Sequence, residues 1–549
     1  MALRAAAALA LGLAAACLGG CGREVEGRSE APVDESRAYG DTLIQSSIGD
    51  ISALIPNITT DGASHEIGGL IYDGLVKSDR NLNFVPQLAE SMRLSADCRT
   101  LDFRLRKNVR WHDGHPFTAD DVAFTYETMV HPKTPSPYKD DFEAIERLDV
   151  LDPHTVRVTY KTPYAKAIQS WSMDVLPKHK LHAYMAEGKL RESPQNRNPV
   201  GTGPYKFKEW KSGEKVVLVS NHDYFEGRPP ISRIVYRIIP SQATIFLELK
   251  ALGVDLAVLT AIQFTRQTEY PAFRKAYQKF RTPGRAYEFL AFNLRDPRFA
   301  DHRVRQAFAH AINKREVIEG VVLGMAREVW GPVRPNTWAY TDKVKRFAFD
   351  PARARALLAE AGWKDRDGDG VIEDANGRPF AFTIRTNQGN DERKRAAEMV
   401  QEHLKQVGIK VDIHVVEWAA FIKEFVKSRK FEVLMLGLGG GGSDPDQYVI
   451  WHSSQTGPDQ MNRTGYANPE VDALLERGRA SCHQPQRIQH YHRIQEILAE
   501  DVPMLFLYVR DALPVVSSRI HGLDPGPSGI TYNFHEWFVP RPLQVYTSG

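Results

Sequence analysis

The segment at residues 88–129 constrains the fold more than any other part of the chain. Between Leu101 and Leu105, apolar side chains alternate with charged ones, which is the pattern of a half-buried strand. Residues 111–114 have the composition of a turn, in which Gly114 can take a positive φ. Thr118 followed by Asp121 is typical of a capping box at the start of a helix. The segment therefore predicts a strand, a turn and a capped helix, and by itself it implies no chemistry.

The N-terminus has the pattern of a bacterial lipoprotein signal. Arg4 is the only charged residue before an apolar run at residues 5–18, and this run is shorter than the roughly 20 residues that span a bilayer. The sequence Leu-Gly-Gly-Cys at residues 18–21 resembles a lipobox, in which the cysteine thiol is acylated and becomes the first mature residue. We expect Cys21 to carry a lipid anchor. An ordinary signal peptide with an incidental cysteine is the alternative.

The rest of the chain is long enough for several domains. Residues 21–38 are rich in Glu, Gly, Arg and Ser, which predicts a flexible tether. Removal of the signal at residues 1–20 leaves 549 − 20 = 529 residues, a length that implies more than one hydrophobic core. The formal charge of +3 becomes +3 − 1 = +2 without Arg4. This balance gives no electrostatic reason to expect nucleic acid or a strongly acidic partner.

Strands and helices are predicted to alternate from Phe380 onward. We expect strands at 380–386, 409–416 and 431–438, with helices at 391–406 and 418–428 between them. Such a run predicts a largely parallel sheet with right-handed crossovers. Ligands of such sheets bind beyond the carboxyl ends of the strands, which places residues 416–418 and 437–446 beside a cleft.

Four motifs occur in an order that is typical of one protein family. They are the segment 88–129, the sequence WSMDVLPKHKLH at 171–182, the turn VGTGPY at 200–205, and a strand beginning YEFLAFNL at 287 that leads to an amphipathic helix. Behind a lipobox, these motifs resemble the family 5 (dipeptide, oligopeptide and nickel type) extracytoplasmic solute-binding proteins of ABC importers. The resemblance extends over about residues 39–540.

The resemblance implies an α/β fold of the type II periplasmic binding protein kind, with two lobes, an extra domain and a hinge. Lobe I is expected at residues 39–66, 195–287 and 510–549, the extra domain at 67–194, and lobe II at 288–509. The strands near Tyr287 and Val509 are expected to form the hinge. Substrate is expected to bind between lobes that close around it.

The resemblance also implies that the protein binds a solute and does not catalyse a reaction. We expect a monomeric, lipid-anchored protein on the periplasm side of a bacterial envelope, which captures peptides and delivers them to a permease driven by a separate ATPase. No cofactor is expected. Two other ligand classes, a chelated metal and an oligosaccharide, remain as alternatives. A secreted hydrolase is the alternative of another class, although the sequence has no G-x-S-x-G, H-E-x-x-H or Walker motif.

The chain departs from the peptide-binding members in the loop after the strand predicted at 431–438. Those members place there an Asp that faces the amino terminus of the peptide, and often a Trp earlier in the loop. Aligned on Asp444, these positions are Gly441 and Leu438 here. We therefore predict that a positively charged amino end is not required, which favours longer or modified peptides. Asp444 is either a ligand contact or a structural Asx turn, and Ser443 beside it is a further candidate contact.

Other candidate contacts lie in two segments. The resemblance places Thr59, Thr60, Asp61 and His65 in the first loop of the cleft. Each of these residues is either a ligand contact or part of the scaffold of that loop. Trp418 either faces the cleft or packs against the start of its own helix.

One acidic segment begins like a calcium loop. Asp365, Asp367 and Asp369 alternate along the chain, and Glu373 lies at the ninth position, an arrangement of oxygen ligands that suits a hard cation. The twelfth position is Asn376 instead of the Glu of an EF-hand. A structural calcium site and a solvated acidic turn are therefore both open interpretations.

Two cysteines remain in the mature chain besides Cys21. Cys98 and Cys482 fall in the extra domain and in lobe II of the predicted domain map. A bridge between them would hinder a hinge motion, and a chain of this size does not need a disulfide for stability. We therefore expect two free thiols.

Overall fold

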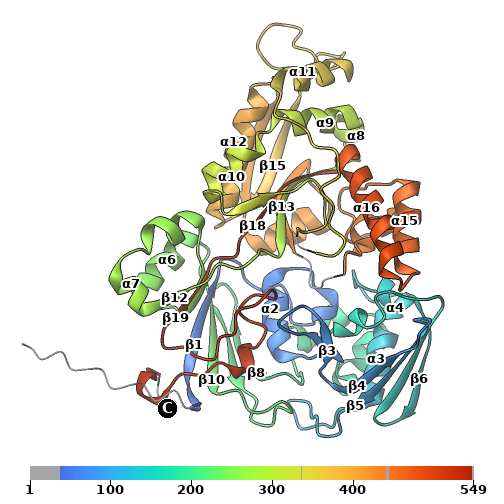
Figure 1. Ribbon diagram of the computed structural model, residues 1–549, viewed down its shortest axis with the longest axis vertical. Coiled ribbons are helices and arrows are strands. Elements are labelled where there is room, and N and C mark those ends of the chain that lie inside the picture. Colours follow the sequence, from blue (N-terminus) through green and yellow to red (C-terminus); the bar gives the residue numbers. More distant parts are fainter. Residues whose placement is uncertain (1–36, 336, 440–443, 547–549) are drawn as a thin grey trace, which may run out of the picture.

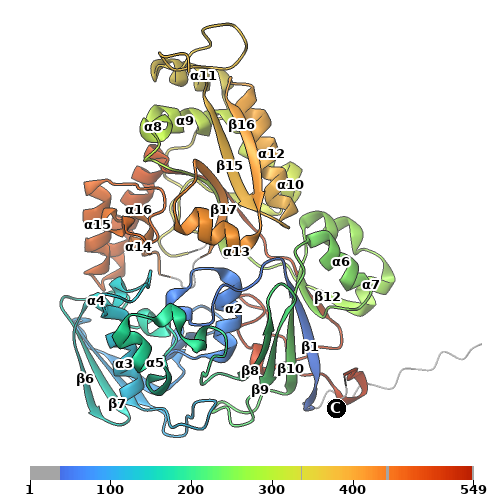
Figure 2. The ribbon, with the colours of Figure 1, turned by 180° about the vertical axis from the view of Figure 1, so that it is seen from behind.

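The computed structural model describes residues 37–335, 337–439 and 444–546. Three large sheets organise these residues, and we name the parts of the molecule after them: lobe I has the seven-stranded sheet, lobe II the six-stranded sheet, and the extra domain the four-stranded sheet. Figures 1 and 2 show lobe II above, with lobe I and the extra domain side by side below it. The predicted α/β class and the two-lobed arrangement are confirmed. Among the described residues, no helix combines the length and the apolar character needed to cross a membrane.

Lobe I is a mixed sheet in the order β12-β19-β11-β1-β10-β9-β8. β1 pairs in parallel with β10 and β11, and the other neighbours are antiparallel. A hairpin turn at Gly213, which has a φ of 73°, joins β8 and β9. The elements are β1 (Gly40–Ser47), β8 (Tyr205–Lys211), β9 (Lys215–Ser220), β10 (Ile231–Ile238), β11 (Leu256–Val258), β12 (Tyr277–Lys279), β19 (Pro514–Ser517), α2 (Gly62–Ile71), α6 (Gln242–Lys250) and α7 (Pro271–Ala276).

The extra domain is an antiparallel sheet in the order β4-β5-β7-β6 with helices beside it. The predicted capping box is present, because the Asp121 carboxylate accepts a hydrogen bond of 3.1 Å from the Thr118 N–H at the start of α3. One cluster of buried side chains includes Leu43 of lobe I together with Phe103 of this domain. Lobe I and the extra domain therefore share a core. The elements are β2 (Val76–Ser78), β3 (Phe84–Pro86), β4 (Ala89–Leu94), β5 (Thr100–Leu105), β6 (Ile145–Asp152), β7 (Thr155–Tyr160), α3 (Ala119–Val130), α4 (Asp140–Glu143) and α5 (Lys178–Glu187).

Lobe II is a sheet in the order β14-β18-β13-β17-β15-β16. The predicted run gives parallel pairs of β15 with β16 and with β17. The prediction of a largely parallel sheet is wrong, because β13, β14 and β18 pair antiparallel and come from segments outside that run. The strands are β13 (Ala286–Phe292), β14 (Ala326–Glu328), β15 (Ala381–Asn387), β16 (Lys410–Val416), β17 (Val433–Gly439) and β18 (Met504–Arg510).

Helices cover the sheet of lobe II and form its outer end (Figures 1 and 2). The helix predicted at 418–428 is a short α-helix, α13, that continues as a π-helix over Phe421–Lys427. The helices are α8 (Pro297–Ala300), α9 (His302–Ala311), α10 (Lys314–Val322), α11 (Pro351–Glu360), α12 (Asp391–Lys405), α13 (Trp418–Ala420), α14 (Tyr448–Trp451), α15 (Pro469–Arg479) and α16 (Gln484–Asp501).

Two neighbouring chain segments connect lobe II with lobe I. Tyr287 of β13 lies opposite Val509 of β18, and a bridge between Thr282 and Ala512 follows where both segments leave lobe II. A Cβ atom at Gly284 would lie 1.6 Å from the carbonyl oxygen of Arg510, so only glycine fits at this point. The residues predicted to form the hinge therefore lie side by side, and the hinge motion itself stays a prediction.

Cys98 and Cys482 form a disulfide, so the expectation of two free thiols is wrong. Cys98 belongs to the turn between β4 and β5 of the extra domain, and Cys482 follows α15 of lobe II. The two residues are 384 positions apart in sequence, but their Cα atoms are 6.4 Å apart, within the usual range for a bridge. The prediction rejected a bridge between domains because it would hinder a hinge motion, whereas the structure places the bridge where these two domains touch.

A polar cavity of about 280 Å³ lies at the C-terminal end of α2, where lobe I meets the extra domain. Asp73 and Asp174 line it, and burial raises the pKa of each carboxyl group to about 7. Asp73 accepts hydrogen bonds from Gln87 at 2.5 Å and from Thr202 at 2.9 Å. The residues that line this cavity come from lobe I and the extra domain and not from lobe II, so it is separate from the space between the lobes.

The raised pKa values predict that the contribution of Asp73 and Asp174 to the free energy of unfolding increases as the pH falls from about 8 to 5. An unfolded Asp has a pKa near 4, so the folded state takes up protons in this range and the charged form is unfavourable above pH 7. We expect Asp174→Asn to raise the free energy of unfolding at pH 8 by about 1 kcal/mol or more, and by clearly less at pH 5. Denaturant unfolding at both pH values measures this, with Asp342→Asn at an exposed position as the control. An equal effect of Asp174→Asn at both pH values would contradict the assignment.

Candidate functional site: the cleft between the lobes

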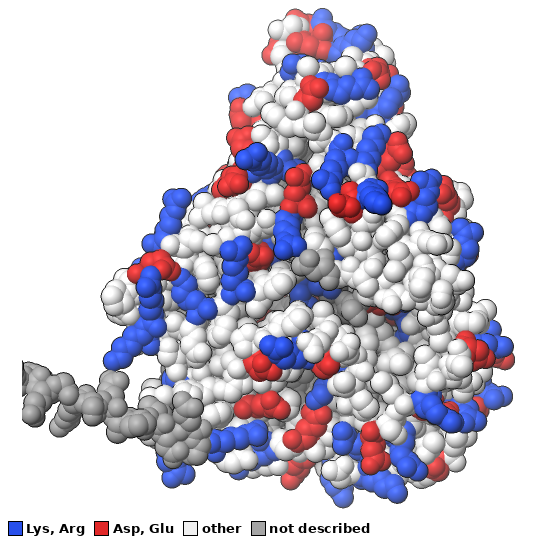
Figure 3. All heavy atoms as spheres, in the orientation of Figure 1, with Lys and Arg blue, Asp and Glu red and all other residues white. Residues whose placement is uncertain are grey.

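The candidate site lies between lobe II and the unit formed by lobe I and the extra domain. Figure 3 shows the surface hollowed between the two lobes. β1 and β10 run in parallel toward lobe II, and Trp418 of lobe II packs at the end of β1. A Cβ atom at Gly49 would lie 2.8 Å from Cδ1 of Trp418, so the indole occupies the space that a side chain would need. Trp418 therefore contacts the opposite lobe at this edge of the cleft, in addition to its neighbour Phe421 on the same helix.

The first loop of the cleft is held by its own polar groups. Asp61 caps α2, accepting hydrogen bonds from the Ser64 N–H at 2.9 Å and from the Ser52 hydroxyl at 2.5 Å. The carbonyl oxygen of Thr59 accepts one from the Tyr138 hydroxyl at 3.0 Å. Asp61 and Thr59 are each only 2% exposed. These two residues therefore shape the loop more than they present polar atoms to a ligand.

The other two residues of this loop are more accessible. Thr60 and His65 are partly exposed, and Nε2 of His65 lies 3.1 Å from the Thr59 carbonyl oxygen and 3.2 Å from the Tyr138 hydroxyl. The structure thus brings the predicted residues of this loop together with Tyr138 of the extra domain. Of the predicted set, Thr60 and His65 have the exposure that ligand contact requires.

Glu66 is a cleft residue that the sequence analysis missed. Its side chain is exposed, yet the surrounding protein desolvates the carboxyl group and raises its pKa above the usual value. The carboxylate accepts hydrogen bonds from Gln45 of β1 at 3.2 Å and from the Tyr236 hydroxyl of β10 at 3.3 Å. An accessible carboxylate with a raised pKa is characteristic of a group in a cleft. The one sequence signal was that Glu66 is the only acidic residue of α2.

Lys427 lies on the opposite side, at the end of the π-helix of lobe II. Burial lowers the pKa of this lysine, Arg191 lowers it further, and Asp61 of lobe I partly offsets both effects. Within the residues that the structure describes, neither Glu66 nor Lys427 takes part in an ion pair. The cleft therefore holds an acid and a base that burial pushes toward their neutral forms.

The loop after β17 is described only in part, because Gly441 and Ser443 lie outside the described residues. Leu438 pairs with Tyr287 of β13 and is partly buried against the core of lobe II. Asp444 forms an ion pair of 2.7 Å with Arg487 and accepts a hydrogen bond of 3.0 Å from the Asp446 N–H. These contacts favour the structural interpretation of Asp444 over ligand contact.

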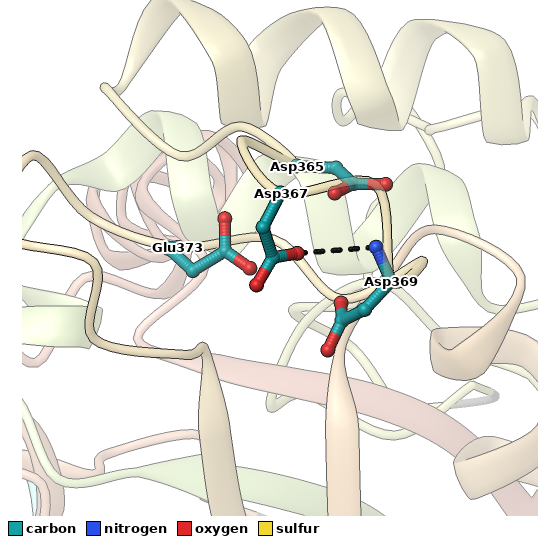
Figure 4. A group of neighbouring side chains, drawn as sticks. All are labelled: Asp365, Asp367, Asp369 and Glu373. Carbon is teal, nitrogen blue, oxygen red and sulfur yellow. Dashed lines mark hydrogen bonds between the residues drawn. The ribbon is translucent and has the colours of Figure 1, made fainter.

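The acidic loop lies at the tip of lobe II, far from the cleft (Figure 1). Figure 4 shows its four carboxylates, and one oxygen from each lies within 4.8 Å of the others. Glu373 is buried and accepts a hydrogen bond of 2.9 Å from the Arg366 N–H, whereas the three aspartates are exposed. The donor set is made of carboxylate oxygens, which suits Ca²⁺. The residues of the set are Asp365, Asp367, Asp369 and Glu373.

The contacts of Asp444 predict that its substitution lowers the stability of the protein and leaves the ligand preference unchanged. The side chains of Asp444 and Arg487 are 12% and 7% exposed, and removing one partner of a buried ion pair costs about 3–5 kcal/mol. Asp444→Asn is therefore expected to lower the free energy of unfolding by about this amount, as measured by denaturant unfolding. Calorimetry should find the same affinity ratio for a free and an N-acetylated peptide as in the wild type. A changed ratio with unchanged stability would instead make Asp444 a ligand contact.

Known proteins share this two-lobed architecture. A family model described as bacterial extracellular solute-binding proteins, family 5 Middle, matches residues 83–460. The oligopeptide-binding protein AppA of Bacillus subtilis (strain 168) is 32% identical over 510 residues, which are 91% of this chain and 92% of that protein. The structure of AppA in complex with a nonapeptide has a TM-score of 0.87 at 31% identity and covers 92% of this chain and 99% of its own. NikZ from Campylobacter jejuni in complex with Ni(L-His) has a TM-score of 0.82 at 28% identity, covering 91% and 99%.

Proposed function

Because the chain belongs to family 5 of the bacterial extracellular solute-binding proteins, we propose that it captures oligopeptides between its lobes for import by an ABC transporter. The observation that carries this proposal is the likeness, over nearly the whole chain, to a binding protein that holds a nonapeptide. The contact between Trp418 and Gly49 supports it, because it joins the two lobes at the edge of the cleft. Ligand contacts from both lobes are then available only in the closed arrangement.

The charges of the cleft favour a ligand with polar groups of both signs. Desolvation raises the pKa of Glu66 and lowers that of Lys427, so the charged form of each group is disfavoured in the absence of a ligand. A peptide brings amide N–H and carbonyl groups together with charges of both signs, and it would offset both penalties. Asp444 is already engaged by Arg487. We therefore keep the proposal that lobe II does not anchor a charged amino terminus and that longer or modified peptides are suitable ligands.

The proposal extends to the state of the mature protein. Family members are extracytoplasmic, and we propose that this chain is held at the membrane through a lipid on Cys21, which lies outside the described residues. We further propose a monomer that delivers its ligand unchanged to the permease. Support for the absence of catalysis comes from the family and from the roles of Asp61 and Thr59, which hold the loop.

A peptide and its N-acetylated form test two parts of the proposal: that the ligand is a peptide, and that lobe II does not bind a charged amino terminus. Calorimetric titration of ligand-stripped protein with a nonapeptide and with its N-acetylated form is expected to give dissociation constants within about threefold of each other. A loss of more than about tenfold (1.4 kcal/mol) on acetylation would contradict the proposal.

Glu66 is the control for any remaining preference for the free amine. Its carboxylate on lobe I attracts a cation, so this preference is expected to disappear in Glu66→Gln. It is also expected to fade as the pH falls through the raised pKa of Glu66, because the neutral acid no longer attracts a cation. Mass spectrometry should recover the peptide intact, whereas cleavage would identify a hydrolase. Native mass spectrometry of the unstripped protein separates peptide from chelated metal and from oligosaccharide.

We also propose that the acidic loop at the tip of lobe II binds a structural calcium ion. Four carboxylates with oxygens within 4.8 Å of one another repel each other unless a cation lies between them. Millimolar Ca²⁺ is expected to raise the melting temperature, more than Mg²⁺ does, because Mg²⁺ demands a stricter geometry. Asp367→Asn should abolish this shift and Asp342→Asn should leave it intact. A shift that persists in Asp367→Asn, or that never occurs, would show a solvated acidic turn.

A further inference from the structure

Lobe II touches the extra domain on the side of the cleft away from the hinge. In Figure 1 the connecting segments run from β13 and β18 at the centre of the molecule to β12 and β19 at the left, whereas α15 meets α4 at the right. The Ala165 N–H donates a hydrogen bond of 2.8 Å to the carbonyl oxygen of Arg479, and Gln455 donates one of 3.0 Å to Asp140. We call this contact the outer seam. It consists of Asp140, Asp141, Ala165 and Lys166 of the extra domain and of Asp446, Gln455 and Arg479 of lobe II.

The charges of the outer seam are paired within each side. Lys166 lies 2.7 Å from Asp141 in the extra domain, and Arg479 lies 2.8 Å from Asp446 in lobe II. The contacts across the seam are longer, 3.3 Å from Lys166 to Asp446 and 3.4 Å from Arg479 to Asp141. Separation of the two sides would therefore leave each charge with its nearest partner. Since the large penalty of an unpaired buried charge is avoided, the noncovalent part of the seam is suited to reversible opening.

The disulfide crosses the same seam. Cys482 follows Arg479 by three residues, and the N–H of Tyr164, next to Ala165 in sequence, donates a hydrogen bond of 3.2 Å to the carbonyl oxygen of Cys98. A covalent bond between the two sides limits the separation of their Cα atoms to about 7 Å. The outer seam thus contains ion pairs that allow its two sides to separate, and a disulfide that prevents this separation.

We propose that Cys98 and Cys482 form a redox-controlled latch: the disulfide holds the lobes closed, and its exchange with a dithiol frees them for uptake and release of ligand. This inference rests on the proposed function for its consequence, because a closed binding protein exchanges peptide slowly. The disulfide would make opening of the cleft depend on redox conditions, which neither Glu66 nor Trp418 does.

The exchange is chemically balanced and sterically accessible. Cys98 is 7% exposed, whereas Cys482 is exposed, so a thiolate of the reductant reaches the sulfur of Cys482. Attack there forms a mixed disulfide, and Cys98 leaves as a thiolate that takes up a proton. The second thiol of the reductant then attacks its own half of the mixed disulfide and releases Cys482. The protein gains two electrons and two protons, and the dithiol becomes a disulfide.

Small-angle X-ray scattering of the ligand-free protein tests the latch without depending on the ligand. We expect a small radius of gyration for the oxidised protein and a larger one after treatment with dithiothreitol. The double variant Cys98→Ser, Cys482→Ser should show the larger radius with or without dithiothreitol, which controls for other effects of the reductant. If this variant does not fold, reduced wild-type protein alkylated with iodoacetamide takes its place.

Release of a fluorescein-labelled nonapeptide tests the consequence. Reduction is expected to increase its dissociation rate by about tenfold or more in the wild type and not in the double variant. Identical scattering of oxidised and reduced protein would overturn the latch, and so would alkylation of both cysteines in protein that was never reduced. A change in scattering without binding of the nonapeptide in either state would instead uphold the latch and remove the proposed ligand class.

Discussion

The structure depends on the fact that two paired segments connect lobe II with lobe I. Thr282 and Ala512 bridge these segments, and Gly284 lies against the backbone of Arg510. Lobe I and the extra domain share one core, in which Leu43 and Phe103 belong to the same buried cluster. A tightly packed core deforms little, so relative motion is concentrated at the two connecting segments. The chain therefore consists of two bodies joined by one narrow connection, about which we expect them to rotate, with the cleft between them.

Charges differ in kind between the cleft and the outer seam. At the seam, Arg479 and Lys166 each have a carboxylate of their own side within 2.8 Å. Asp141 and Asp446 raise the pKa of Lys166 despite its burial. In the cleft, burial shifts the pKa of Glu66 upward and that of Lys427 downward. The seam charges are thus satisfied by the protein, and the cleft charges are left for a ligand to satisfy.

Sequence patterns predicted what depends on near neighbours. The capping box of Thr118 and Asp121 and the parallel pairs of β15 follow from spacing within one segment. The family resemblance supplied the two-lobed arrangement, which no periodicity contains. The antiparallel strands of lobe II and the partners of Asp444 could not be predicted, because they depend on segments such as that of Arg487, 43 residues away. Glu66 was missed for the same reason, since its raised pKa arises from desolvation by the folded protein, which the hydrogen bonds from Tyr236 and Gln45 offset only in part.

The expectation that Cys98 and Cys482 are free thiols was wrong because it was based on their assignment to different domains. A bridge between domains was rejected because it would hinder a hinge, and the structure places it where it hinders a hinge most. A rotation about the joint near Tyr287 moves atoms in proportion to their distance from that joint, and the outer seam lies on the opposite side of the cleft. A restraint there blocks small rotations that a restraint beside the joint would allow. The position of Cys98 and Cys482 thus makes a single covalent bond sufficient to hold two lobes together, although their ion pairs are arranged to part.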